Sequence, residues 1–130
     1  KFREKAYEVL KFLNLHYIKD MYVAGQPYGI LKKIEIARAL MANPKMIILD
    51  EPAAGLNDME TDELATLLRE IRDKFDVTVI LVEHDMGFVM DICDRICAIS
   101  FGKLLAIDTP VNIQNNKLVQ EAYLGGEEDE

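Results

Sequence analysis

One short apolar segment that ends in two carboxylates constrains the fold of this chain more than any other feature. Residues 46–49 are Met-Ile-Ile-Leu, and Asp50, Glu51 and Pro52 follow directly. A short apolar run bounded by turn-forming residues indicates a strand that is buried on both faces. Asp50 and Glu51 then lie at the carboxyl end of that strand, where open α/β sheets bind their ligands. Adjacent carboxylates at this place cost free energy unless something uses them, and a magnesium ion with an attacking water would use both.

The same string also has a purely structural interpretation, in which the two acids only cap the following helix. Short motifs of this kind give many false matches, so the string alone does not decide between the two interpretations. The neighbouring segments must decide.

Composition excludes several classes of protein. The 130 residues include 15 basic and 23 acidic side chains, for a formal charge of −8, and this balance argues against a nucleic-acid partner. No apolar stretch is long enough to span a membrane. The chain starts at Lys1 without an initiator methionine, inside a helical pattern, so we expect a fragment. Its two cysteines, Cys93 and Cys97, are expected to be buried, reduced thiols.

Helical and strand patterns alternate along the chain. Apolar residues recur at helical spacing before residue 43 and again over 58–75, and in the first region Ile30, Ile34, Ala37 and Met41 are expected to form one face of a helix. Apolar strand-like runs cover 46–50, 77–82, 95–101 and 104–107. Short helices are expected near 86–93, after Pro110 and near 117–124. The order strand, helix, strand, helix, strand from 46 to 100 predicts a parallel sheet, and therefore an α/β fold. We expect a helical subdomain over 1–43, a sheet-containing part over 44–124 and a disordered acidic tail over 125–130.

Polar residues follow the strands at corresponding places. Asp50 and Glu51 end one strand, and His84 ends the next. Parallel strands bring their carboxyl ends to one edge of the sheet, so we expect these side chains to meet. Two carboxylates and a histidine suit phosphoryl transfer, in which catalysis is mostly positioning and charge stabilisation. The helix that begins at Tyr28 and Gly29 could present free amide groups to a phosphate.

Several motifs, in order, resemble the ATP-binding cassette (ABC) transporter ATPases. They are Tyr28-Gly29, then Glu35 to Leu40, then Ile48 to Pro52, then Gly55-Leu56-Asn57, and then Glu83-His84-Asp85. The segments around Met86, Asp94-Arg95, Thr109-Pro110 and Glu121 to Gly125 are similar to the ATPase subunits of branched-chain amino acid importers. The resemblance runs from about residue 22 to the end of the chain, and it implies a partial P-loop NTPase fold.

The resemblance implies a role for each of six residues. Asp50 would help to hold Mg²⁺ through water, Glu51 would be the general base for the attacking water, and His84 would be the switch histidine that contacts the γ-phosphate of ATP. Tyr28, Gly29 and Asn57 would help to bind the nucleotide, although Asn57 is explained equally well as a helix N-cap. The implied partners are the N-terminal half of the cassette, a second ABC ATPase subunit and transmembrane permease subunits. The implied location is cytoplasmic, on the inner face of the cell membrane.

Two features of the chain depart from the family pattern. Where the family signature has Leu-Ser-Gly-Gly-Gln, residues 26–30 are Gln-Pro-Tyr-Gly-Ile. Pro27 lacks the hydroxyl and the amide hydrogen that a phosphate contact needs, and Ile30 cannot replace a glutamine. The string G-x-x-x-x-G-K-[ST], which forms the phosphate loop, does not occur in the 130 residues. We therefore expect the C-terminal half of a nucleotide-binding domain, whose sheet lacks the phosphate-loop strand and which is inactive alone.

Two functions remain open at this point. One is the C-terminal half of an importer ATPase that works with Mg²⁺ and ATP in a complete cassette. The other is a truncated module that acts only as a binding or regulatory partner. A phosphate loop upstream of Lys1 would favour the first.

Overall fold

The computed structural model describes residues 1–124. The chain divides into two compact units, Lys1–His84 and Asp85–Glu130, and each is described separately. The predicted acidic tail, residues 125–130, lies outside the described residues. The predicted boundary between residues 43 and 44 stays a prediction.

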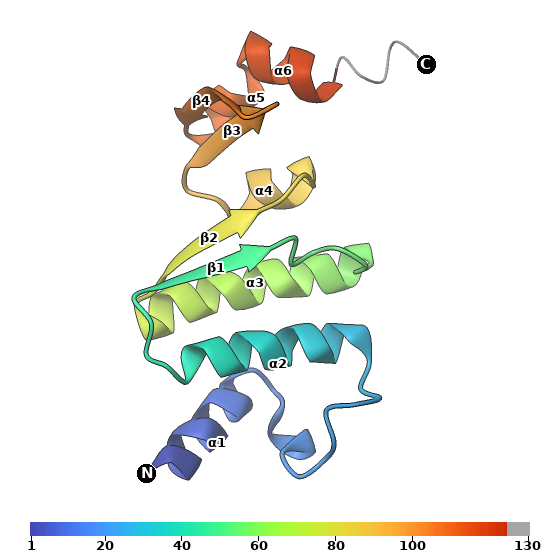
Figure 1. Cartoon of the computed structure of the whole chain (residues 1–130), viewed down its shortest axis with the longest axis vertical. Helices are drawn as coiled ribbons and strands as arrows, with labels where there is room; N and C mark the ends of the chain where they lie inside the picture. The colour runs from blue at the N-terminus through green and yellow to red at the C-terminus, as the bar shows by residue number, and fades with distance from the viewer. Residues whose placement is uncertain (125–130) are drawn as a thin grey trace. The chain divides into compact units, whose positions relative to one another are not determined.

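The first unit contains four helical segments and a pair of strands (Figure 1). In chain order they are α1 (Phe2–Phe12), η1 (His16–Ile18), α2 (Tyr28–Leu40), β1 (Met46–Asp50), α3 (Asp58–Phe75) and β2 (Thr78–Val82). β1 and β2 pair in parallel, with Met46 opposite Thr78 and Asp50 opposite Val82. This pairing confirms the predicted parallel crossover through α3, and it brings the carboxyl ends of both strands to one edge.

Helix α3 forms the centre of the core of this unit. Its buried side chains follow a helical period and are Leu64, Ala65, Leu67, Leu68 and Ile71. In Figure 1, α3 runs along the strand pair and α2 lies beside α3. Ile47 of β1 and Leu40 of α2 are also buried. Burying a leucine or isoleucine side chain contributes about 1.5–3 kcal/mol. The buried face of α3 therefore holds β1 and β2 in place.

The prediction that the strand at residues 46–50 is buried on both faces is wrong for the residues that the structure describes, and its partner β2 is also open on one face. Ile48 is 60% exposed, Ile80 42% and Val82 54%, whereas Ile47 is only 6% exposed. Side chains alternate between the two faces of a strand, so these values separate a covered face from an open one. Helix α3 covers one face, and no described element of this unit covers the other.

The buried face of α2 also differs from the predicted one. The pattern predicted Ile30, Ile34, Ala37 and Met41, whereas Ile36, Ala37 and Leu40 are the buried residues. The helix has apolar residues on more than one side, so its neighbours rather than its periodicity decide which side is buried.

The second unit is built on a β-hairpin. It contains α4 (Met86–Ile92), β3 (Ile96–Ser100), β4 (Lys103–Asp108), α5 (Pro110–Gln114) and α6 (Lys117–Leu124). The two strands are antiparallel, and Phe101 and Gly102 both have positive φ angles, of 47° and 74°, at the turn. Ala98, Ile113 and Val119 form its buried cluster. Among the described residues, parallel pairing is therefore confined to β1 and β2 and does not extend to the strand predicted over 95–101.

Both cysteines lie in this unit as free thiols. Cys93 is partly buried, but Cys97 is exposed on β3, so the prediction of two buried thiols is wrong for Cys97. Its neighbour Ala98 takes the buried position, because successive residues of a strand point to opposite faces. Within residues 1–124, no helix is both long enough and apolar enough to cross a membrane.

Candidate functional site

The acidic pair lies where β1 passes into a tight turn. Asp50 is the last residue of the strand, and Glu51 follows with a left-handed φ of 47°. Residues with a side chain seldom adopt this conformation, and it costs on the order of 1–3 kcal/mol. Two hydrogen bonds hold it: the Glu51 amide donates to the Val82 carbonyl at 2.7 Å, and the Ala54 amide donates to the Glu51 carbonyl at 3.1 Å. The turn therefore directs the Glu51 side chain away from the strand.

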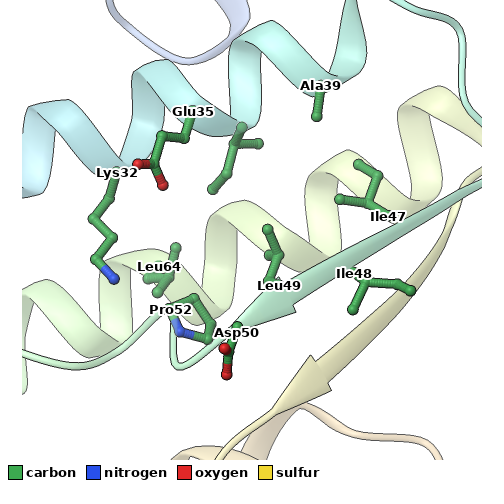
Figure 2. Close-up of a pocket in the computed structure, with 10 residues that line it drawn as sticks. Lys32, Glu35, Ala39, Ile47, Ile48, Leu49, Asp50, Pro52 and Leu64 are labelled. Carbon is green, nitrogen blue, oxygen red and sulfur yellow. The ribbon is translucent and has the colours of Figure 1, made fainter.

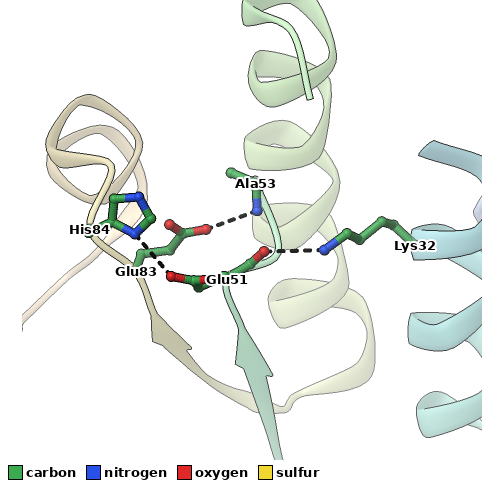
Figure 3. A network of polar contacts seen from close by, with 5 residues as sticks. All are labelled: Lys32, Glu51, Ala53, Glu83 and His84. Atoms are coloured by element: carbon green, nitrogen blue, oxygen red, sulfur yellow. Dashed lines mark hydrogen bonds and ion pairs between the residues drawn. The ribbon is translucent and has the colours of Figure 1, made fainter. Parts of the chain in front are cut away.

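His84 lies beside this turn. It follows β2, and the register that sets Asp50 opposite Val82 brings residue 84 near residue 51. His84 Nδ1 is 3.1 Å from Oε1 of Glu51, as Figure 3 shows. Both side chains are open to solvent, with exposed fractions of 76% and 51%. A carboxylate and an imidazole at this distance can accept a proton and hold it near a reacting water.

Two further side chains tie the turn to its surroundings. Lys32 of α2 donates from Nζ to the Glu51 carbonyl at 3.2 Å. The Ala53 amide donates to Oε1 of Glu83 at 2.9 Å, and Figure 3 shows both contacts. Neither Lys32 nor Glu83 was among the predicted site residues. Their positions, one turn inside a helix and one residue before His84, are the signals that could have singled them out.

The start of α2 packs against the same loop. Tyr28 begins this helix, and its ring lies so close to Gly55 that a Cβ added to Gly55 would be 2.9 Å from the ring. Gly55 also has a φ of 79°, which glycine adopts without strain. Lys32 Nζ lies 5.1 Å from the centre of the Tyr28 ring, so one lysine contacts both Tyr28 and the Glu51 backbone. Tyr28 therefore has a packing function.

The first turn of α2 has no side-chain cap, because Pro27 occupies the N-cap position. The Ile30 amide donates to the Pro27 carbonyl at 3.0 Å, so the amide groups of Tyr28 and Gly29 are the ones open to an external acceptor such as a phosphate. However, a Cβ added to Gly29 would be 3.0 Å from Oε2 of Glu60. A carboxylate this close to the helix start repels an anion, and phosphate binding by this turn stays a prediction.

Asn57 acts as the N-cap of α3. Its side chain accepts a hydrogen bond from the Glu60 amide at 2.8 Å, and the Glu60 side chain accepts one from the Asn57 amide at 3.2 Å. These reciprocal bonds form a capping box. The structure thus shows a structural function for Asn57, and a contact with nucleotide stays a prediction.

A cavity of about 300 Å³ lies between α2 and β1 (Figure 2). Three of the side chains that line it are charged, Lys32, Glu35 and Asp50, and the others are apolar. Asp50 is exposed to solvent. No group of three or more metal-ligating side chains occurs in residues 1–124. One carboxylate with water and phosphate oxygens is a donor set that Mg²⁺ accepts, so Asp50 fits the water-mediated role expected of it.

The loop over residues 51–57 joins all six predicted site residues. Glu51 and His84 are in contact at one side of this loop, and Asp50 directly precedes Glu51 at the same edge of the sheet. Tyr28, Gly29 and Asn57 gather at the other side, through Gly55 and Glu60. The order of strands predicts the first group, whereas the second comes together through packing.

Solved structures share the fold described above, and related sequences are similar to this chain. The structure superposes on the ADP conformation of MJ1267, an ATP-binding cassette of an ABC transporter, with a TM-score of 0.86 and 31% identity over 95% of this chain and 50% of that chain. The family model described as ABC transporter matches residues 1–54. The high-affinity branched-chain amino acid transport ATP-binding protein BraF of Pseudomonas aeruginosa is 44% identical over 122 residues, which are 94% of this chain and 48% of BraF. The chain belongs to the ABC transporter ATPase family.

A second relative of this ABC ATPase chain supports the same family. LivG of Escherichia coli, also a high-affinity branched-chain amino acid transport ATP-binding protein, is 49% identical over 98 residues. These are 75% of this chain and 38% of LivG. The chain thus spans about half the length, or less, of the curated relatives that it matches. Membership of the family and the α/β fold class confirm the resemblance seen in the motifs.

Proposed function

We propose that the chain supplies the catalytic edge and the signature helix of an ABC importer ATPase. The observation that carries this proposal is the meeting of Glu51 and His84, with 3.1 Å between Oε1 and Nδ1, at the ends of two parallel strands. In this proposal Glu51 accepts a proton from the attacking water. His84 holds Glu51 by a hydrogen bond and faces the γ-phosphate.

The other elements serve binding in this proposal. Asp50 orients a water on Mg²⁺, which neutralises charge on the phosphates when it is bound. The free amide groups at the start of α2, at Tyr28 and Gly29, face a nucleotide held by a second cassette. Asn57, which caps α3, keeps the intervening loop in the shape needed to cross between the two cassettes.

The proposal includes the partners and the cargo. The N-terminal half of a cassette supplies the phosphate loop, a second ATPase subunit completes the site, and permease subunits anchor the pair at the cytoplasmic face of the membrane. BraF and LivG, both named for branched-chain amino acid transport, point to these amino acids as the cargo. Uptake of labelled leucine, in cells that lack LivG and carry a LivG chimera with this chain, tests this part.

The chemistry is tested by Glu51→Gln in that chimera, in which residues 1–124 replace the part of LivG that contains the 98 aligned residues. The amide keeps the shape of the side chain but accepts protons poorly, so kcat falls about 100-fold or more. ATP binding, measured by calorimetry, is retained. Glu70→Gln, an exposed change on α3, is the control and keeps full turnover.

Unchanged turnover in the Glu51→Gln chimera contradicts the role of general base. A folded parent chimera that binds its partners but hydrolyses no ATP favours the alternative, a non-catalytic binding or regulatory module.

A further inference from the structure

Glu83 has no part in the chemistry proposed above, yet its carboxylate is committed to one contact. The side chain is partly buried, and Oε1 accepts a hydrogen bond of 2.9 Å from the Ala53 amide. Ala53 itself is only 7% exposed. A charged acceptor strengthens such a bond, and partial burial reduces competition from water.

The contact joins the two segments that carry the reacting groups. Ala53 lies two residues after Glu51, in the turn that follows β1, and Glu83 directly precedes His84 after β2 (Figure 3). The segment at the end of β2 therefore holds the turn twice: Glu83 binds its backbone, and His84 contacts its carboxylate.

The turn needs such support because of the conformation of Glu51. Its φ of 47° persists only where surrounding bonds hold the backbone. The bonds from the Glu51 amide and to the Glu51 carbonyl hold the start of the turn. The Glu83 bond holds its next part, from the side that carries His84.

We propose that Glu83 is a positioning residue, which fixes the turn over residues 51–55 against His84 by holding the Ala53 amide. The effect of Glu83 on catalysis rests on the ATPase function proposed above. Glu83 touches neither water nor nucleotide in this role. It keeps the Glu51 carboxylate at the distance from His84 at which it can take a proton.

Three variants of the LivG chimera separate this role from others. Glu83→Gln keeps an oxygen that accepts the Ala53 hydrogen bond, Glu83→Ala removes it, and Glu83→Asp is one methylene too short to reach. Glu70→Ala, on the exposed side of α3, is the control for loss of a carboxylate. Exchange of the Ala53 amide hydrogen, followed by NMR, reports the bond directly, and steady-state kinetics report its consequence.

With Glu83→Ala and Glu83→Asp, we expect the Ala53 amide to exchange about tenfold faster or more, because a local opening is no longer opposed by this bond. We expect kcat to fall about tenfold, with KM for ATP changed less than about twofold, because the lost interaction acts only in the chemical step. Glu83→Gln restores both values to within about threefold of the parent. If Glu83 only stabilised the fold, its loss would lower the thermal midpoint of unfolding without a selective fall in kcat at nearly constant KM.

Three results overturn the proposal: Ala53 exchange and kcat that stay within about twofold of the parent in Glu83→Ala, a loss of kcat without faster exchange, or a Glu83→Gln variant as slow as Glu83→Ala. If Glu83→Ala does not fold, the Asp and Gln variants decide in the same way. A parent chimera without ATP hydrolysis defeats the proposed function, whereas the exchange measurement still decides whether Glu83 holds the turn.

Discussion

At the scale of single residues, backbone conformation matters as much as side-chain chemistry. Glu51 occupies the left-handed region, with a φ of 47°, directly after a strand. The conformation bends the chain so that the carboxylate meets His84 instead of continuing the alternation of the strand. Its cost, on the order of 1–3 kcal/mol, is offset by the bonds to Val82, Ala54 and Lys32.

The two cysteines give a prediction at this scale. Partial burial, with the nearby Asp94 charge, raises the pKa of the Cys93 thiol, so less of it is in the reactive thiolate form. Cys97 is exposed. At about pH 8, iodoacetamide should modify Cys97 several-fold faster than Cys93 in the native chain, as read by mass spectrometry of the peptides. In denaturant the two rates should converge, and a faster native reaction at Cys93 contradicts the prediction.

At the scale of elements, the loop from residue 51 to residue 57 organises the site. It receives the Tyr28 ring at Gly55, the Lys32 ammonium at Glu51 and the Glu83 carboxylate at Ala53. Its end is the capping box at Asn57, which starts α3. The loop thus links the start of α2, both strands and the start of α3. Displacement of any of these elements would therefore affect the position of Glu51 through a few short contacts.

The capping box makes a prediction about stability. Asn57→Ala leaves the Glu60 amide without its acceptor, so the free energy of unfolding should fall by about 1 kcal/mol. Asn57→Asp keeps an acceptor oxygen and should cost much less. Urea unfolding of the two variants and the parent, followed by circular dichroism, measures the difference. Equal stability of Asn57→Ala and the parent contradicts the role of the cap.

At the scale of the whole molecule, the chain exposes one apolar face of a parallel strand pair. Ile48, Ile80 and Val82 lie on it, each at least 42% exposed. Within residues 1–124, each strand of the pair also has one edge without a strand partner. Apolar faces and free strand edges of this kind favour association with other chains.

We therefore expect the isolated 130-residue chain to associate as its concentration rises. Val82→Lys should shift it toward the monomer in analytical ultracentrifugation, because a charged side chain opposes burial of this face. Val111→Lys makes the same chemical change at another exposed valine and should have little effect. A chain that stays monomeric at high concentration, or an equal response to both variants, contradicts this expectation.

Local signals in the sequence identified most helices and strands, the acidic pair and the histidine. Short apolar runs, helical spacing and capping residues act over a few residues, so the strand at 46–50, the helix at 58–75 and the cap at Asn57 were all predicted. The order of strands and the crossover rule were enough to bring Asp50, Glu51 and His84 to one edge.

Tertiary structure alone decided the rest, because burial and long-range contacts depend on which elements pack together. The sequence could not show that the face with Ile48 and Val82 stays open, that Cys97 is exposed, or that α2 buries Ile36 and Leu40. Nor could it show the left-handed turn at Glu51 or the bond between Glu83 and Ala53, which spans 30 residues. Residue types along the chain thus determined what chemistry was available, and folding decided which groups are held within reach of one another.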